Sequence, residues 1–159
     1  MMKHRRKIIY LAGFLFSVAL ALVSYINSSF LEKFINQDYV GIVYTVASIL
    51  TIWGLLQMPK ILTHLGNRRS IMLSASLIFV SFLLLAYGKT AFIIIPAFVL
   101  YFTSVGLVIS SLDIFIEDFS GQGSIGSFRG LYLMIISMAW VLSQLVSGTI
   151  INKTSFEGI

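Results

Sequence analysis

The sequence predicts an all-α membrane protein with five transmembrane helices. The chain has 159 residues, of which 58% are hydrophobic and 11% are charged, whereas a soluble domain carries roughly 25% charged residues. Five apolar stretches are also long enough to cross a bilayer as helices, which takes about 20 residues. They cover residues 8–26, 40–58, 71–87, 91–112 and 131–151. We therefore expect a single transmembrane domain over residues 1–159, embedded as a multi-pass protein in a cell membrane (plasma or inner membrane).

The first stretch follows the basic segment Met1–Lys7. A secretory signal peptide begins in the same way, but no small-x-small cleavage site follows residues 8–26, and further apolar stretches do. We interpret residues 8–26 as a retained first span, with a cleaved signal peptide as the alternative.

The second and third stretches are separated by the basic segment Pro59–Arg69, which the sequence predicts to be a loop in water. A cation at the centre of a bilayer costs about 2.5–3.5 kcal/mol, so these residues should lie outside the hydrocarbon. With five spans, eight of the eleven Lys and Arg residues fall on the side that holds this loop and the amino terminus. The positive-inside rule therefore places the amino terminus in the cytoplasm.

The third and fourth stretches are joined by the short segment Gly88–Thr90. So short a connection predicts that these two spans pack as an antiparallel hairpin. The fourth and fifth stretches are separated by a longer acidic and glycine-containing segment, which predicts a loop.

Several classes of function are excluded by composition. The basic residues punctuate apolar runs instead of clustering on a polar domain, which argues against binding to nucleic acid. The chain has no cysteine, and no second histidine lies near His64, so we expect no metal site and no cofactor. Phosphate-binding and hydrolase motifs are missing, so an enzyme is not expected. The centres of the spans carry no charge, which argues against a proton relay.

The sequence contains a short internal repeat. Phe30–Phe34 follows the first span, and the similar segment Phe115–Phe119 follows the fourth. An offset of three spans places the two copies in opposite orientations, which is typical of a 3+3 inverted repeat in secondary transporters. A sixth span would then follow Ile159, and the chain would be truncated before it. The alternative is coincidence between two apolar sequences.

The basic loop resembles the loop between spans two and three of the major facilitator superfamily. Gly66, Arg68 and Arg69 match that loop, whereas Pro59 stands at its first glycine and Thr63 at its acidic position. The approach to the fifth span is similar to the acidic loop and Arg-Gly pair found in many members. The residues concerned are Asp113, Glu117, Asp118, Arg129 and Gly130.

The resemblance implies the first five of twelve spans of a transporter that moves a small solute by alternating access. Gly66, Arg68 and Arg69 would form a cytoplasmic gate loop, and the four charged residues before the fifth span would be its partners. The carboxy-terminal spans of the same transporter would complete it. Of the antiporter motif only Gly148 remains, and Phe102 stands where members often carry an intramembrane arginine. The alternative function is a small five-span membrane subunit with a structural or assembly role.

Polar residues on the spans are the candidates for a solute pathway. In the family, spans one and four line the central cavity. The candidate cavity residues are Ser24, Tyr25 and Asn27 on the first span, Tyr101 and Ser104 on the fourth, and Gln144 on the fifth. The alternative is that these residues let helices approach closely and bond to one another. Asp113 and Glu117 share a helix face, as paired carboxylates for acid–base chemistry or as an interfacial acidic cluster.

Overall fold

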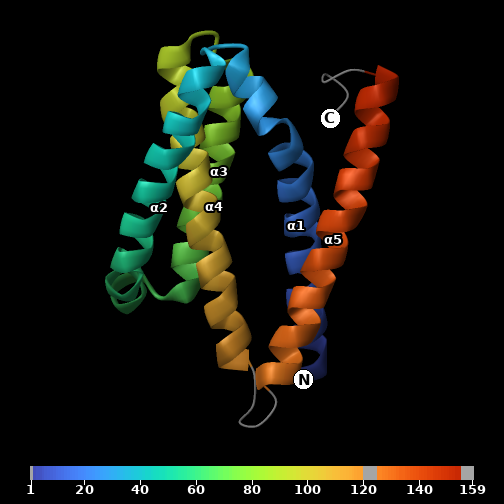
Figure 1. Ribbon diagram of the computed structural model, residues 1–159. Helices are drawn as coiled ribbons and strands as arrows, with labels where there is room; N and C mark the ends of the chain where they lie inside the picture. The colour runs from blue at the N-terminus through green and yellow to red at the C-terminus, as the bar shows by residue number, and fades with distance from the viewer. Residues whose placement is uncertain (1, 120–124, 155–159) are drawn as a thin grey trace. The chain divides into compact units, whose positions relative to one another are not determined.

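The structure of the chain, a computed structural model, consists of helices (Figure 1). It describes residues 2–119 and 125–154, and the side chains of residues 10–117 (except Tyr25) and 126–146. The helices are α1 (Met2–Glu32), α2 (Gln37–Leu65), α3 (Asn67–Tyr87), α4 (Ala91–Phe119) and α5 (Ile125–Thr154). All five contain a segment long and apolar enough to span a membrane, and the described residues include no strand. The predicted all-α fold with five membrane-spanning helices is therefore confirmed.

The chain divides into two compact units. Unit one comprises Met1–Ser29 and Ile116–Ile159, and so contains most of α1 and all of α5. Unit two comprises Phe30–Phe115, and so contains α2, α3 and most of α4.

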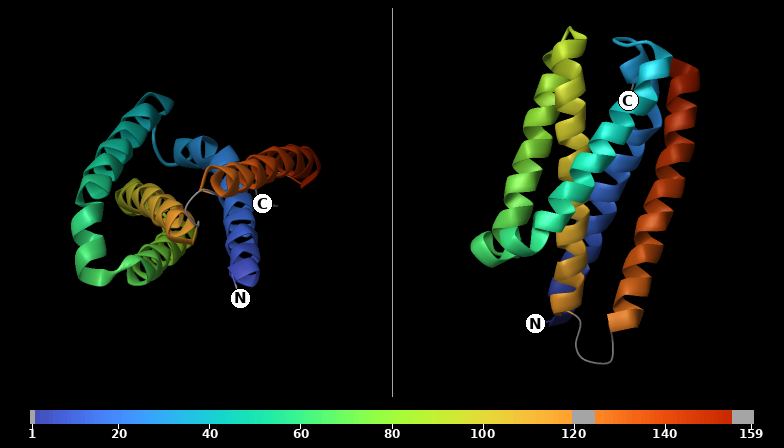
Figure 2. Two further views of the ribbon diagram at one scale, coloured as in Figure 1. Left: turned by 90° about the horizontal axis from the view of Figure 1, so that it is seen from below. Right: turned by 60° about the vertical axis from the view of Figure 1, so that its left-hand side comes forward.

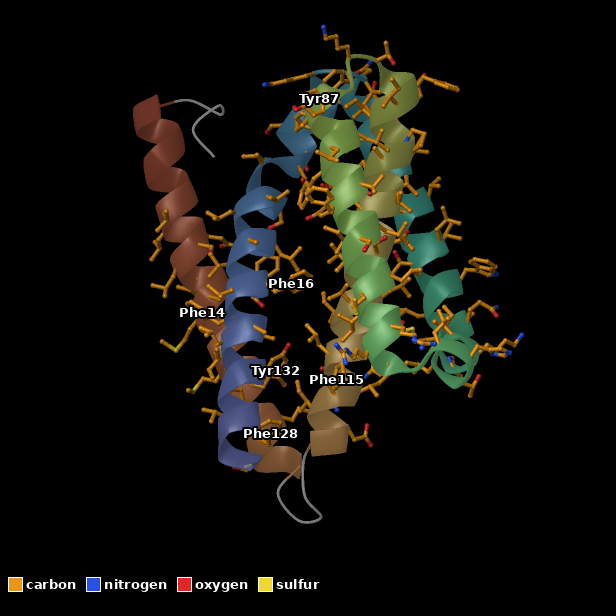
Figure 3. All side chains as sticks on the ribbon, turned by 180° about the vertical axis from the view of Figure 1, so that it is seen from behind. Phe14, Phe16, Tyr87, Phe115, Phe128 and Tyr132 are labelled. Atoms are coloured by element: carbon orange, nitrogen blue, oxygen red, sulfur yellow. The ribbon has the colours of Figure 1, made fainter. Side chains whose placement is uncertain are left out.

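Unit one is held together by a close approach of α1 and α5 (Figure 3). A Cβ atom placed on Gly13 would lie only 2.5 Å from Cε2 of Tyr132, so only a hydrogen fits there. The rings of Tyr10 and Phe128 lie 5.0 Å apart beside this contact. Tyr132 and Phe128 are buried in one cluster with Ile116. The contact between a small residue, Gly13, and an aromatic residue, Tyr132, therefore determines how closely α1 and α5 approach.

In unit two, small residues bring α2 close to α4. A Cβ atom on Gly106 would lie 2.6 Å from Cγ2 of Thr51, and one on Gly54 would lie 3.4 Å from Leu107. Toward the other end of the pair, Tyr44 packs edge-on against Phe98, with ring centroids 5.2 Å apart. Close approach at small residues is the usual way in which helices associate where lipid removes the hydrophobic driving force.

Helices α3 and α4 pack through faces rich in serine. The side-chain N–H of Asn67 donates a hydrogen bond to the backbone carbonyl of Ser111 (3.1 Å), and the ring of Phe82 lies 5.2 Å from that of Tyr101. The two helices are joined by Gly88–Thr90, so the predicted antiparallel hairpin is confirmed. Serine also fills most of the buried positions of α3, namely Ser70, Ser74 and Ser81.

The predicted loop Pro59–Arg69 is wrong in its extent. Helix α2 continues through Pro59 to Leu65, and Gly66 alone separates it from α3. The physical reason is length: a 29-residue helix is about 43 Å long, whereas the hydrocarbon core is about 30 Å thick. Helix α2 can therefore stay helical beyond the hydrocarbon. Its last turns, where Pro59 lies, bend away from the rest of the helix (Figures 1 and 2), as expected where proline removes a backbone hydrogen bond.

Gly66 occupies a backbone conformation that other residues avoid. Its φ is 75° and its ψ is 158°, a region essentially restricted to glycine. We expect Gly66→Ala to lower the free energy of unfolding by at least about 1 kcal/mol, because alanine is strained there. The measurement is unfolding by SDS in mixed micelles. Gly41→Ala is the matched control, since a Cβ atom at Gly41 meets nothing within 4 Å, and it should leave stability unchanged or raised.

Candidate functional site

The predicted gate-loop residues lie at the tight connection between α2 and α3. The Gly66 N–H donates to the carbonyl of Leu62 (2.9 Å), and the Gly66 carbonyl accepts from the N–H of Ser70 (3.1 Å). Gly66 thus closes the last turn of one helix and opens the first turn of the next. Arg68 and Arg69 follow at once and are exposed. The connection is therefore a fixed turn that presents two guanidinium groups at one end of unit two.

The two arginines are poorly placed for the stability of their own helix. The first turn of α3 contains no acidic residue, and Gly66 gives it no side-chain cap. A cation at a helix amino terminus opposes the helix dipole, which is worth about 0.3–1 kcal/mol at an exposed site. Arg68 and Arg69 are thus better suited to an anionic group outside α3 than to α3 itself.

The last residues of α2 before Gly66, residues 59–65, include no Asp or Glu. The hydroxyl of Thr63, at the acidic position of the resemblance, donates to the carbonyl of Lys60 (2.8 Å). The ring Nδ1 of His64 lies 2.9 Å from the same carbonyl oxygen. The charge on this segment is therefore all positive, and any acidic partner must come from another helix.

The predicted loop charge partners are divided between the two units. Asp113 belongs to unit two and lies two residues beyond Ser111, whose carbonyl accepts the bond from Asn67. Asp113 is therefore at the same end of unit two as Gly66. Glu117 and Arg129 belong to unit one, and both are exposed. The side chain of Asp118 lies outside the described residues.

The candidate cavity residues of α1 and α5 differ in their surroundings. The hydroxyl of Ser24 donates to the carbonyl of Ala21 (3.0 Å), a bond within its own helix. Asn27 is half-buried, and Gln144 is exposed. The side chain of Tyr25 lies outside the described residues. Asn27 and Gln144 thus keep amide groups that can reach beyond their own helices.

The candidate cavity residues of α4 lie inside helix packing. Tyr101 is 3% exposed and Ser104 is 1% exposed. The ring of Tyr101 packs against Phe82 of α3. In this conformation neither side chain offers a surface to a solute.

The serine face of α3 was not among the sequence-based predictions. Ser70, Ser74 and Ser81 are each 2% exposed or less. Their spacing of four and seven residues places them on one side of a helix, and small residues at such spacings mark close helix packing in membranes. That spacing was the signal that could have found them.

Among the described side chains, no group of three His, Asp or Glu residues could hold a metal ion. The chain matches no protein-family model, no curated protein and no solved structure.

Proposed function

We propose that the chain forms the amino-terminal part of a secondary transporter of the major facilitator type, which moves a small solute by alternating access. The observation that carries the proposal is the connection between α2 and α3. A glycine-only turn at Gly66 holds two long helices, and Arg68 and Arg69 are exposed directly behind it. A fixed basic turn of this kind suits a gate that closes on acidic residues from other helices.

The ends of unit two support the same proposal through their charge. The end that holds Gly66 carries Lys60, Arg68 and Arg69 against one carboxylate, Asp113. A basic excess at one end predicts that this end faces the cytoplasm, with the amino terminus on the same side. A Thr63→Cys variant should therefore react with a membrane-impermeant thiol reagent added on the cytoplasmic side, and labelling only from the opposite side would contradict this orientation.

The spans support transport of a solute without a proton relay of their own. All five apolar stretches carry polar residues, and none of the five contains a charged residue. In this proposal the solute pathway runs along α1, where Ser24 and Asn27 lie, and is completed by spans beyond Ile159.

The pathway is tested by the reactivity of cysteines placed on α1, since the chain has no cysteine of its own. We expect Ser24→Cys, which lies within the span 8–26, to react with a water-soluble maleimide, because a thiolate forms only in contact with water. Leu15→Cys is the control: Leu15 is 58% exposed on the same helix, and in lipid it should stay unlabelled. Equal, negligible labelling of the two variants would contradict a solute pathway at Ser24.

The alternative function, a five-span subunit, makes a different prediction about the gene. Further spans encoded beyond Ile159 would favour the transporter. A stop codon there, with a folded product that assembles without transporting, would favour the subunit.

A further inference from the structure

A groove runs between α2 and α4 in unit two. Its volume is about 630 Å³, within the range of pockets that hold small molecules. Trp53, Gly54 and Gln57 of α2 line it, together with Thr103 and Leu107 of α4. Gly54 has no side chain to fill this space, and a Cβ atom on it would already contact Leu107 at 3.4 Å and Thr103 at 3.8 Å. The groove is open to the surroundings of the helices, which in a membrane protein are lipid.

Two polar groups border this otherwise apolar groove. The Thr103 hydroxyl is buried and has no hydrogen-bond partner within the described part of the chain. Gln57 is half-buried, and its amide likewise makes no hydrogen bond to the residues described. Acyl chains offer no partner for such groups, and an unmade bond costs roughly 1–3 kcal/mol. An occupant with hydrogen-bonding atoms near Gln57 would remove part of that cost.

The end of the groove at Ile61 lies beside a basic surface. Ile61 lines the groove, and the adjacent residue on α2, Lys60, is exposed. Arg68 and Arg69 follow across Gly66. Gln57, one turn before Ile61, is therefore placed between an apolar groove and a basic surface.

This arrangement is one-sided within unit two. At the opposite end, Lys33 and Lys89 are balanced by Glu32 and Asp38, so that end has no net charge. The cationic end thus fits an anion, and the groove beside it fits a hydrocarbon chain. Trp53, two turns before Lys60 on α2, adds an indole ring that is 62% exposed on the groove.

We propose that the groove between α2 and α4 is a binding site for an anionic glycerophospholipid. One acyl chain lies along Trp53 and Leu107, an ester group lies at the amide of Gln57, and the phosphate lies at Lys60 and Arg68. The proposal does not depend on transport, because it rests on the groove and its charge alone.

The test uses the fluorescence of Trp53 in the full chain. The second tryptophan is removed by Trp140→Phe, and the protein is placed in phosphatidylcholine vesicles with a minor share of brominated lipid. Bromine quenches an indole in contact with it. We expect brominated phosphatidylglycerol to quench Trp53 more than brominated phosphatidylcholine at the same share. Equal quenching by the two lipids would overturn the proposal.

Charge variants separate this site from general attraction to an anionic surface. We expect Lys60→Gln and Arg68→Gln each to weaken the preference for phosphatidylglycerol about fivefold. Lys89→Gln removes the same charge at the opposite end and should leave the preference intact. If Lys60→Gln and Lys89→Gln behave alike, the headgroup does not lie at Lys60.

Filling the groove tests the place of the acyl chain. Gly54→Leu should abolish the preference, and Leu100→Phe, which fills the groove from α4, serves if Gly54→Leu fails to fold. A preference retained in a folded, filled variant would overturn the proposal. So would protection of Trp53 from both lipids as protein concentration rises, because a second copy of the chain would then occupy the groove.

Discussion

Gly13→Leu is expected to destabilise unit one by about 3 kcal/mol. A side chain on Gly13 would begin 2.5 Å from Cε2 of Tyr132, well below the 3.0 Å that real Cβ contacts essentially always exceed. The Tyr132 ring cannot turn aside easily, since it is 3% exposed and packs in one cluster with Ile116 and Phe128. Overpacking of this kind typically costs 1–3 kcal/mol and occasionally more. The measurement is the free energy of unfolding by SDS in mixed micelles.

Two further variants show whether the cost comes from this contact. Gly130→Leu is the matched control in the same unit: a Cβ atom there meets nothing within 4 Å, so the change should be within about 0.5 kcal/mol. In a Tyr132→Ala background, Gly13→Leu should cost less than in the parent, with a coupling of about 0.5–3 kcal/mol. Strictly additive effects of Gly13→Leu and Tyr132→Ala would show that α1 and α5 do not meet at Gly13.

The sequence was sufficient for the helices because their signal is local. Apolar length and the placement of cations predicted five spans, and the short segment Gly88–Thr90 predicted the hairpin of α3 and α4. The segment Pro59–Leu65 was wrongly predicted to be a loop. Its charge and its proline indicate exposure to water, but a helix that extends beyond the hydrocarbon is also exposed to water. Glycine at Gly66 was the true end of α2.

Packing between helices was much harder to predict, because it depends on which spans meet. Gly13 is unremarkable in the sequence until Tyr132, far along the chain, is known to face it. Tyr101 and Ser104 formed a polar stripe that indicated either a pathway or packing, and nothing local separates the two readings. Their burial follows from the position of α3, whose own serines lie within an apolar run of the sequence.

The second large effect is expected at the interface of α3 and α4. Ser74 lies two turns after Asn67, and Ser104 lies two turns before Ser111. Because Asn67 bonds to Ser111 and the helices are antiparallel, Ser74 and Ser104 should face each other at the same level. Ser74→Leu would then separate the helices, at a cost of about 3 kcal/mol in the same SDS assay, whereas Ser74→Ala should stay within about 0.5 kcal/mol.

A cysteine pair tests the register directly, because a disulfide requires Cα atoms about 4.4–6.8 Å apart. In this cysteine-free chain, Ser74→Cys with Ser104→Cys should give one cross-linked tryptic peptide by mass spectrometry after mild oxidation. Ser76→Cys with Ser104→Cys should not, since Ser76 is exposed and bonds to the carbonyl of Met72 (2.9 Å) on its own helix. Cross-linking through Ser76 alone would place a different face of α3 against α4. A cross-link through Ser74 would instead place the serine face of α3 against Ser104 of α4.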